Sequence, residues 1–329
     1  MKIAVYAIMK NEEAFLKRFL ESCKDADYIL LCDTGSDKKI NHGPSWGRDI
    51  PYRVENINVM PWRFDDARNA ALSLLPRNID VCIALDLDEV LVPGWREKIE
   101  AAFTLWPETT RLRYNYIWSW KEDGTPDLTY HADKIHVRNG YRWKGIVHEV
   151  TNYDSRLGPE VETFIRDTLI EHHPDPTKSR SDYLPLLKIN CDENPHDDRS
   201  RHYYGRELWY RGRYQEAIIE LNKHVLMPEA KFLAEKSRSY EIIGHCHFQL
   251  QEWDKALENF STAAQIAPGT REPWLALAEF YQGYCDWAKV KFYIEKCLSI
   301  TDKPNVYINT GKAWGPWPEQ LHKMALEHT

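Results

Sequence analysis

The sequence lacks the features that mark several large classes of protein. It has no run of the ~20 apolar residues that a membrane-spanning helix needs. None of its seven cysteines is spaced as C-x-x-C, and their number is odd, so a disulfide framework is not indicated. The apolar opening, residues 2–9, stops at Lys10-Asn11-Glu12-Glu13 without a small-residue cleavage site and is typical of a buried strand, not of a signal peptide. We expect a soluble, cytoplasmic protein with reduced cysteines.

An excess of positive charge is also missing. The chain carries 43 Lys and Arg against 50 Asp and Glu, a formal net charge of -7. This balance argues against a general affinity for nucleic acid or anionic membranes, although a local basic groove is not excluded by an average. The length of 329 residues and the hydrophobic content of 43% predict a sizeable core and about two domains.

Residues 1–180 alternate between short apolar runs and helical patterns, which favours an α/β domain with a largely parallel sheet. Strands are expected at residues 3–8, 28–33, 52–59 and 81–85, and helices at residues 12–23 and from residue 65 onward. The middle of the chain alternates with period two and predicts a mixed extension of the sheet, with strands at residues 111–118, 134–138 and 146–150.

Residues 181–329 lose the strand pattern and show helical periodicity, so we predict a second, all-α domain there. The segment from Gly205 to Ala217 is echoed from Gly244 to Ala256, and a looser third copy ends at Ala288. A repeat of about 34 residues with this pattern resembles the tetratricopeptide repeat. An unrelated helical bundle is the alternative. Repeats of this kind bind peptides or mediate self-association, so a homo-oligomer is possible in principle.

Acidic residues follow the apolar strand at residues 81–85. Asp86 and Asp88 are two residues apart, so in an extended segment both carboxylates face one space. Mg²⁺ or Mn²⁺ commonly takes one or two carboxylates together with substrate phosphates. Because ligands of open α/β sheets bind at the carboxyl ends of the strands, this segment predicts a divalent-metal and nucleotide site. A solvated acidic turn is the competing interpretation.

His148 and Glu149 follow a second apolar run. An imidazole beside carboxylates gives a mixed nitrogen and oxygen ligand set, which suits Mn²⁺. A histidine with only local hydrogen bonds is the alternative. The sequence His172-His173-Pro174 lies near the expected domain junction, where a closing loop and an ordinary polar linker are both compatible with the pattern.

Five ordered motifs in residues 1–150 together resemble the family 2 glycosyltransferases: residues 9–13, 32–37, 62–69, 85–89 and 145–149. The resemblance implies the A-type glycosyltransferase fold, a Rossmann-like mixed sheet, here followed by tetratricopeptide repeats. It also implies a nucleotide-diphosphate sugar donor, most often linked to UDP, and a hexose or N-acetylhexosamine as the transferred group.

The same resemblance assigns residue roles. Asp88 and His148 would ligate the metal. The nucleotide sugar would contact the remaining members of the set, which are Tyr6, Ala7, Asp33, Arg68, Asp86 and Leu87. Asp33 in an Asx turn and Arg68 in a helix-surface ion pair are the alternatives that the residues themselves allow.

An inverting transfer needs a base that accepts the proton of the acceptor. Glu149 is the first choice and Asp123 the second. The acceptor is expected to be a peptide or protein recognised partly by the repeats. The alternatives are a glycan or a hydroxylated nucleobase as acceptor, or a non-catalytic tetratricopeptide-repeat scaffold.

Overall fold

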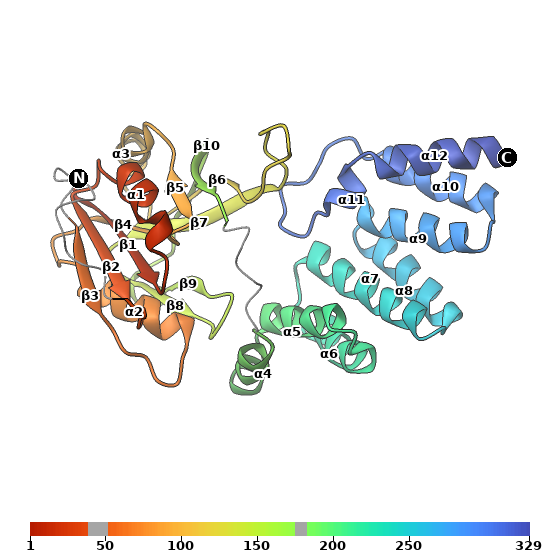
Figure 1. Ribbon diagram of the computed structural model, residues 1–329, viewed down its shortest axis with the longest axis horizontal. Helices are drawn as coiled ribbons and strands as arrows, with labels where there is room; N and C mark the ends of the chain where they lie inside the picture. The colour runs from red at the N-terminus through yellow and green to blue at the C-terminus, as the bar shows by residue number, and fades with distance from the viewer. Residues whose placement is uncertain (39–51, 175–182) are drawn as a thin grey trace. The chain divides into compact units, whose positions relative to one another are not determined.

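The structure, a computed structural model, describes residues 1–38, 52–174 and 183–329. The chain divides into two compact units, Met1–Arg180 and Ser181–Thr329. The boundary that the sequence predicts after residue 180 lies outside the described residues. Unit 1 is mixed α/β and unit 2 is a helical repeat region, as the coarse sequence prediction states (Figure 1).

An eight-stranded sheet forms the centre of unit 1, in the order β3-β2-β1-β4-β7-β6-β10-β5. Strands β1 to β4 run parallel, and β7 pairs antiparallel with both β4 and β6. The strands are β1 (Ile3–Met9), β2 (Tyr28–Asp33), β3 (Arg53–Asn56), β4 (Val81–Ala84), β5 (Glu89–Leu91), β6 (Arg111–Ile117), β7 (Thr129–Val137) and β10 (Glu162–His172).

Strand β1 is buried on both faces because helices cover both sides of the sheet. Its residues Ile3, Val5 and Ala7 pack with helices α1 (Glu13–Ser22) and α3 (Trp95–Leu105). Its alternate residues, Ala4, Tyr6 and Ile8, pack with helix α2 (Phe64–Leu74). A parallel strand between two helical layers reads as one continuous apolar run, which is why the sequence predicts β1 correctly.

The strand expected at residues 146–150 is wrong. Those residues form most of the loop of a hairpin between β8 (Tyr141–Lys144) and β9 (Val150–Tyr153). Gly145 and His148 have φ of 104° and 56°, which turn the chain back on itself and are incompatible with a strand. The Asn69 amide and the Trp143 backbone exchange two hydrogen bonds of 2.9 Å, so the hairpin is fixed to α2.

Unit 2 is built of helices, which are α4 (Leu184–Glu193), α5 (Asp198–Tyr210), α6 (Tyr214–Leu226), α7 (Leu233–Gln249), α8 (Trp253–Ile266), α9 (Glu272–Gly283), α10 (Trp287–Leu298), α11 (Gly311–Trp314) and α12 (Trp317–His328). The last two of these, α11 and α12, follow the repeated hairpins. None of the helices in the described part of the chain is long and apolar enough to cross a membrane.

Three helical hairpins, α5–α6, α7–α8 and α9–α10, repeat the same contacts. Gly205 of α5 packs on Leu221 of α6, and 39 residues later Gly244 packs on Phe260. In the third hairpin the corresponding positions, 34 residues on, are Ala278 and Ile294, which share one apolar cluster. A small residue on the first helix lets the second approach closely.

The turns of the three hairpins are also the same. Gly212, Gln251 and Cys285 adopt φ of 70°, 62° and 54° at corresponding positions. The next residue in each turn donates its N–H to the carbonyl five positions before it, with N···O distances of 3.0, 2.9 and 3.1 Å. A left-handed residue followed by a hydrogen bond to the carbonyl five positions earlier is a common way to end a helix and reverse the chain.

The third copy predicted from the sequence needs a correction. Ala288 was expected at the position of Ala217 and Ala256, but it is exposed, and the fully buried Val290 occupies that position. Each second helix begins at an aromatic residue, and the buried position is the fourth of that helix in all three hairpins. The spacing from Ala256 to Val290 is 34 residues, the length typical of this repeat.

Candidate functional site

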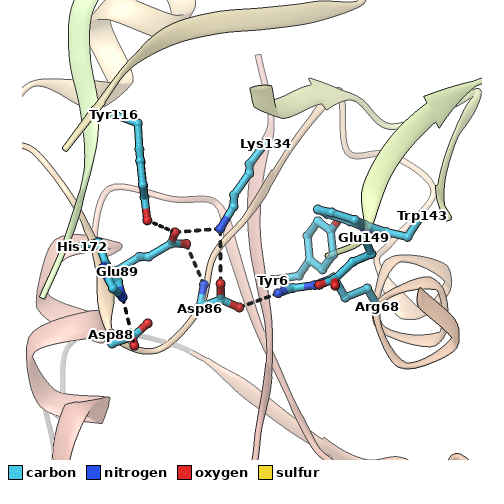
Figure 2. A network of polar contacts seen from close by, with 10 residues as sticks. All are labelled: Tyr6, Arg68, Asp86, Asp88, Glu89, Tyr116, Lys134, Trp143, Glu149 and His172. Carbon is cyan, nitrogen blue, oxygen red and sulfur yellow. Dashed lines mark hydrogen bonds and ion pairs between the residues drawn. The ribbon is translucent and has the colours of Figure 1, made fainter. Parts of the chain in front are cut away.

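The acidic segment after β4 forms a tight turn. The Glu89 N–H donates to the Asp86 carbonyl at 2.9 Å, and the Asp86 N–H donates to the Glu89 side chain at 2.9 Å. Because the segment turns, the alternation expected for an extended chain does not apply. Asp86 and Asp88 contact different partners (Figure 2).

Glu89 is the buried centre of this region, with an exposed fraction of 1%. Its carboxylate accepts hydrogen bonds from Lys134 at 2.7 Å and from the Tyr116 hydroxyl at 2.5 Å. Lys134 also donates to Asp86 at 3.2 Å. Burial alone would lower the pKa of Lys134, but Asp86 and Glu89 outweigh it and raise that pKa, so the ammonium stays charged.

Arg68 of α2 joins Asp86 to the β8–β9 hairpin. Its guanidinium donates to Asp86 at 2.5 Å and to Glu149, and it lies over the Trp143 ring at 5.0 Å. Trp143 in turn donates to the Tyr6 hydroxyl at 2.7 Å. Burial would raise the pKa of Asp86, but Arg68 and Lys134 outweigh it and hold that pKa well below its usual range. The helix-surface ion pair considered for Arg68 is therefore wrong, because the side chain is buried.

One donor of Arg68 has no partner. Its Nη1 is buried and makes no hydrogen bond, while Nε and Nη2 are used. The neighbouring Asp86 side chain is 40% exposed. The cluster can therefore still offer a charged donor and a carboxylate to a bound group.

Asp88 pairs with His172, the last residue of β10. The Asp88 Oδ2 to His172 Nε2 distance is 3.3 Å, and His172 Nδ1 lies 2.9 Å from the Trp118 carbonyl oxygen. The Trp118 and His172 rings stack at 4.4 Å. Burial would lower the pKa of His172, but Asp88 and the Trp118 carbonyl outweigh it and raise that pKa. His172 belongs to a strand, not to a junction loop as the sequence suggested.

The predicted metal ligands Asp88 and His148 belong to no group of three closely spaced ligating side chains in the described part of the chain. In the part of the chain that the structure describes, one group of three metal-ligating side chains has its ligand atoms close together, and it lies in unit 2. His148 sits in the β8–β9 loop with a left-handed backbone. The observed partner of Asp88 is His172, and two ligand atoms at 3.3 Å could still hold one ion together with substrate phosphates.

Several side chains assigned to the nucleotide are enclosed by the core. Tyr6, Ala7 and Leu87 are 0–1% exposed as whole residues, so they offer almost no surface to a ligand. Asp33 is 4% exposed, and its Oδ1 accepts the Gly35 and Ser36 N–H groups at 3.0 and 2.8 Å. That arrangement is the Asx turn considered from the sequence.

The two candidate bases differ in environment. Glu149 is 10% exposed at its side chain and is bound to Arg68, so it positions that guanidinium. Asp123 is exposed and accepts hydrogen bonds from the Thr125 N–H and hydroxyl at 2.9 and 2.6 Å, which lower its pKa. Both carboxylates therefore already accept hydrogen bonds from neighbouring residues.

Sequence reasoning missed Glu89, Tyr116 and Lys134, and it considered His172 only as part of a closing loop or linker. Glu89 directly follows Asp88 and therefore had a local signal, whereas Lys134 stands beside another charged residue, Asp133, and was not distinguished from it. Tyr116 had no local signal, because its contact with Glu89 joins strands that are apart in the sequence. A pocket of about 540 Å³ lined by Arg77, Asp80, Arg138 and Tyr153, among others, lies at the opposite, amino end of β4 and is separate from this cluster.

Comparisons with known proteins found similarity among solved structures alone. No family model matches the chain, and no curated protein does. Among solved structures, MamA is 18% identical over 44% of this chain and 85% of its own, with a TM-score of 0.33. Pseudomonas aeruginosa PilF is 18% identical over 36% of this chain and 53% of its own, with a TM-score of 0.32. Cut9–Hcn1 of the APC/C is 16% identical over 43% of this chain and 26% of its own, with a TM-score of 0.35.

These results correct one expectation. The resemblance to family 2 glycosyltransferases is contradicted, since no family model matches the chain and none of these solved structures is a glycosyltransferase. The sugar-transfer activity that the resemblance implied has no support among these comparisons.

Proposed function

We propose that unit 2 is a tetratricopeptide-type scaffold that binds a segment of a partner protein. The observation that carries the proposal is the threefold recurrence of one hairpin with the same turn bond, together with the close glycine contact in the first two hairpins. Such hairpins cannot bury their apolar faces alone, and stacking them creates an extended surface that suits a peptide. Self-association through this surface is the second form that the scaffold could take.

A row of cationic and aromatic side chains on α5 and α7 fits that use. Arg206 lies 4.4 Å from the Tyr203 ring and 5.9 Å from the Tyr210 ring, and Arg238 lies 5.8 Å from Trp209. Trp209 stacks on His245 at 5.9 Å. Tyr210 is 50% exposed. Aromatic and arginine side chains are the usual anchors of protein interfaces, and arginines suit a partner segment that carries carboxylates.

The test is selection of peptides from a displayed random library on the full-length chain. We expect enriched peptides with acidic residues, and at least tenfold weaker binding to Arg206→Ala and Tyr210→Ala. Leu226→Ala is the matched control, because this residue is 79% exposed at the end of α6 and outside the row. Absence of enriched peptides, or equal binding to all three variants, contradicts the proposal.

A second candidate function belongs to unit 1, and the buried cluster around Asp86 favours it. We propose metal-dependent transfer of a hexosyl group from a nucleotide-diphosphate sugar, independent of any family membership. Asp88 with His172 would hold Mn²⁺ or Mg²⁺, which supplies charge stabilisation for the leaving diphosphate. The unpartnered donor of Arg68 would bind the nucleotide or its phosphates. For this candidate we also propose the A-type fold and inversion at the anomeric carbon. The acceptor would be a peptide, a glycan or a nucleobase.

Binding of sugar nucleotides tests this candidate directly. Titration of UDP-sugars with Mn²⁺ should give saturable binding that Asp88→Asn weakens, together with release of nucleotide diphosphate. Asp154→Asn, a carboxylate that pairs with Arg156 near the pocket at the amino end of β4, is the control. If no nucleotide sugar binds and no nucleotide diphosphate is released, the candidate is ruled out.

The proposal includes a reducing, cytoplasmic setting, in which the seven unpaired thiols persist.

A further inference from the structure

Three helix ends of unit 2 bring metal-ligating side chains together. Asp198 is the first residue of α5, His224 lies in the last turn of α6, and Glu235 is the third residue of α7. One ligand atom from each lies within 4.8 Å of the other two. The three residues are far from one another in the sequence, so the repeat geometry assembles them.

His224 points an unused nitrogen into this group. The residue is 1% exposed, and its Nε2 has no hydrogen-bond partner. Nε2 lies 3.5 Å from Oε1 of Glu235, which is itself 4% exposed. Two ligands bound at ~2.0–2.1 Å in tetrahedral geometry are separated by roughly 3.4 Å, so this spacing fits one shared cation.

The other side of the His224 ring has the partner that a metal-binding imidazole needs. Nδ1 lies 2.9 Å from the Ser239 hydroxyl, and that hydroxyl lies 2.7 Å from Nδ1 of His202. In the arrangement of protons that suits metal binding, the Ser239 hydroxyl donates to Nδ1 of His202. His224 then donates its Nδ1–H to Ser239 and keeps a lone pair on Nε2. A hydrogen bond of this kind fixes the tautomer of metal-binding histidines.

We propose that Asp198, His224 and Glu235 form a Zn²⁺-type site that ties α5, α6 and α7 together. One nitrogen and two carboxylate oxygens are ligands that zinc accepts, and three protein ligands leave a fourth position for water or a partner side chain. The site is distinct from the Asp88 cluster of unit 1. It goes beyond the scaffold proposal, because it predicts a bound ion within the first two repeats.

The experiment measures zinc in the full-length chain by elemental analysis after dialysis against ZnCl₂ and then against metal-free buffer, and measures affinity by calorimetry. We expect one high-affinity Zn²⁺ per chain. His224→Ala should lose it, and Asp198→Asn, which replaces a half-buried carboxylate and preserves its shape, should weaken it at least tenfold. Circular dichroism identifies variants that fail to fold.

His322→Ala is the matched control. His322 Nε2 lies 3.5 Å from Glu295, the same spacing as in the proposed site, but no third ligand joins that pair among the described residues. Asp88→Asn is a second control, which tests whether the measured zinc is bound at the Asp88 cluster of unit 1. Both variants should keep the ion. No zinc uptake by the unmodified chain, undiminished affinity in folded His224→Ala or Asp198→Asn, or loss in either control overturns the proposal.

Discussion

Gly244 lies directly against Phe260: a Cβ at Gly244 would meet Cδ1 of that ring at 2.6 Å. The same relation holds between Gly205 and Leu221, where a Cβ would also overlap the facing side chain. At Gly244 the close approach of the second helix explains the glycine, because its own backbone is helical and needs no special φ. The third hairpin has Ala278 at the corresponding position.

Gly244→Ala should destabilise unit 2 despite alanine's higher helix propensity. Overpacking a well-packed contact costs about 1–3 kcal/mol, which exceeds the gain of about 1 kcal/mol from replacing glycine in a helix. Gly283→Ala, where nothing lies within 4 Å, is the control and should not lower stability. Denaturant unfolding followed by circular dichroism measures both. Equal stability of the two variants would contradict the packing argument.

The hairpin turns predict the opposite effect for another substitution. Gln251 and Cys285 adopt positive φ where the first hairpin has Gly212. A left-handed conformation costs a non-glycine residue about 1 kcal/mol, so Gln251→Gly should raise the unfolding free energy by that order. Gln251→Ala keeps the strained backbone and should give no such gain. A stabilisation by alanine as large as that by glycine would exclude backbone strain as the cause.

The buried Lys134–Glu89 pair should be essential for the stability of unit 1. Lys134→Ala leaves the Glu89 carboxylate buried without its cation, which costs about 3–5 kcal/mol. Lys98→Ala removes a surface pair with Asp167 and should cost less than about 1 kcal/mol. Chemical denaturation measures both losses, and a similar small loss for the two variants would show that the buried pair is not important for folding.

The pH dependence of unit 1 should include a contribution from His136. Burial lowers its pKa to about 4, whereas an unfolded histidine titrates near 6.5. Between these values the unfolded chain binds more protons, so the unfolding free energy falls as the pH is lowered, by about 3 kcal/mol once the pH is below about 4. His136→Gln should flatten this part of the profile, while the exposed His196→Gln should not. An unchanged slope in His136→Gln would refute the contribution.

The sequence predicts best what depends on local pattern. Both faces of β1 are buried, so its uninterrupted apolar run identifies it, and the hairpins of unit 2 follow from helical periodicity. The β8–β9 loop could not be predicted, because Ile146 and Val147 are as buried as strand residues and only the backbone of Gly145 and His148 reverses the chain. Ala288 was assigned by its residue type, whereas the position within the helix decides which side chain is buried, and that position holds Val290.

The candidate site shows the same limit. Asp86 and Arg68 were both identified from the sequence, yet their direct contact comes from the packing of α2 on β1, the strand next to β4 in the sheet. His172 reaches Asp88 only because β10 joins the sheet next to β5. Contacts between strands that are distant in the chain produce no periodic pattern in the sequence. The partner of a strand therefore cannot be predicted from either segment alone.

The shared turn of the three hairpins affects how unit 2 comes apart. Each turn bond spans only five residues, so the chain reversal of every hairpin is determined by residues within that hairpin. Its packing, in contrast, depends on the hairpins beside it, and only the middle one has a hairpin neighbour on each side. Local unfolding of unit 2 should therefore begin at the outer hairpins. The α7–α8 hairpin should keep its structure longest.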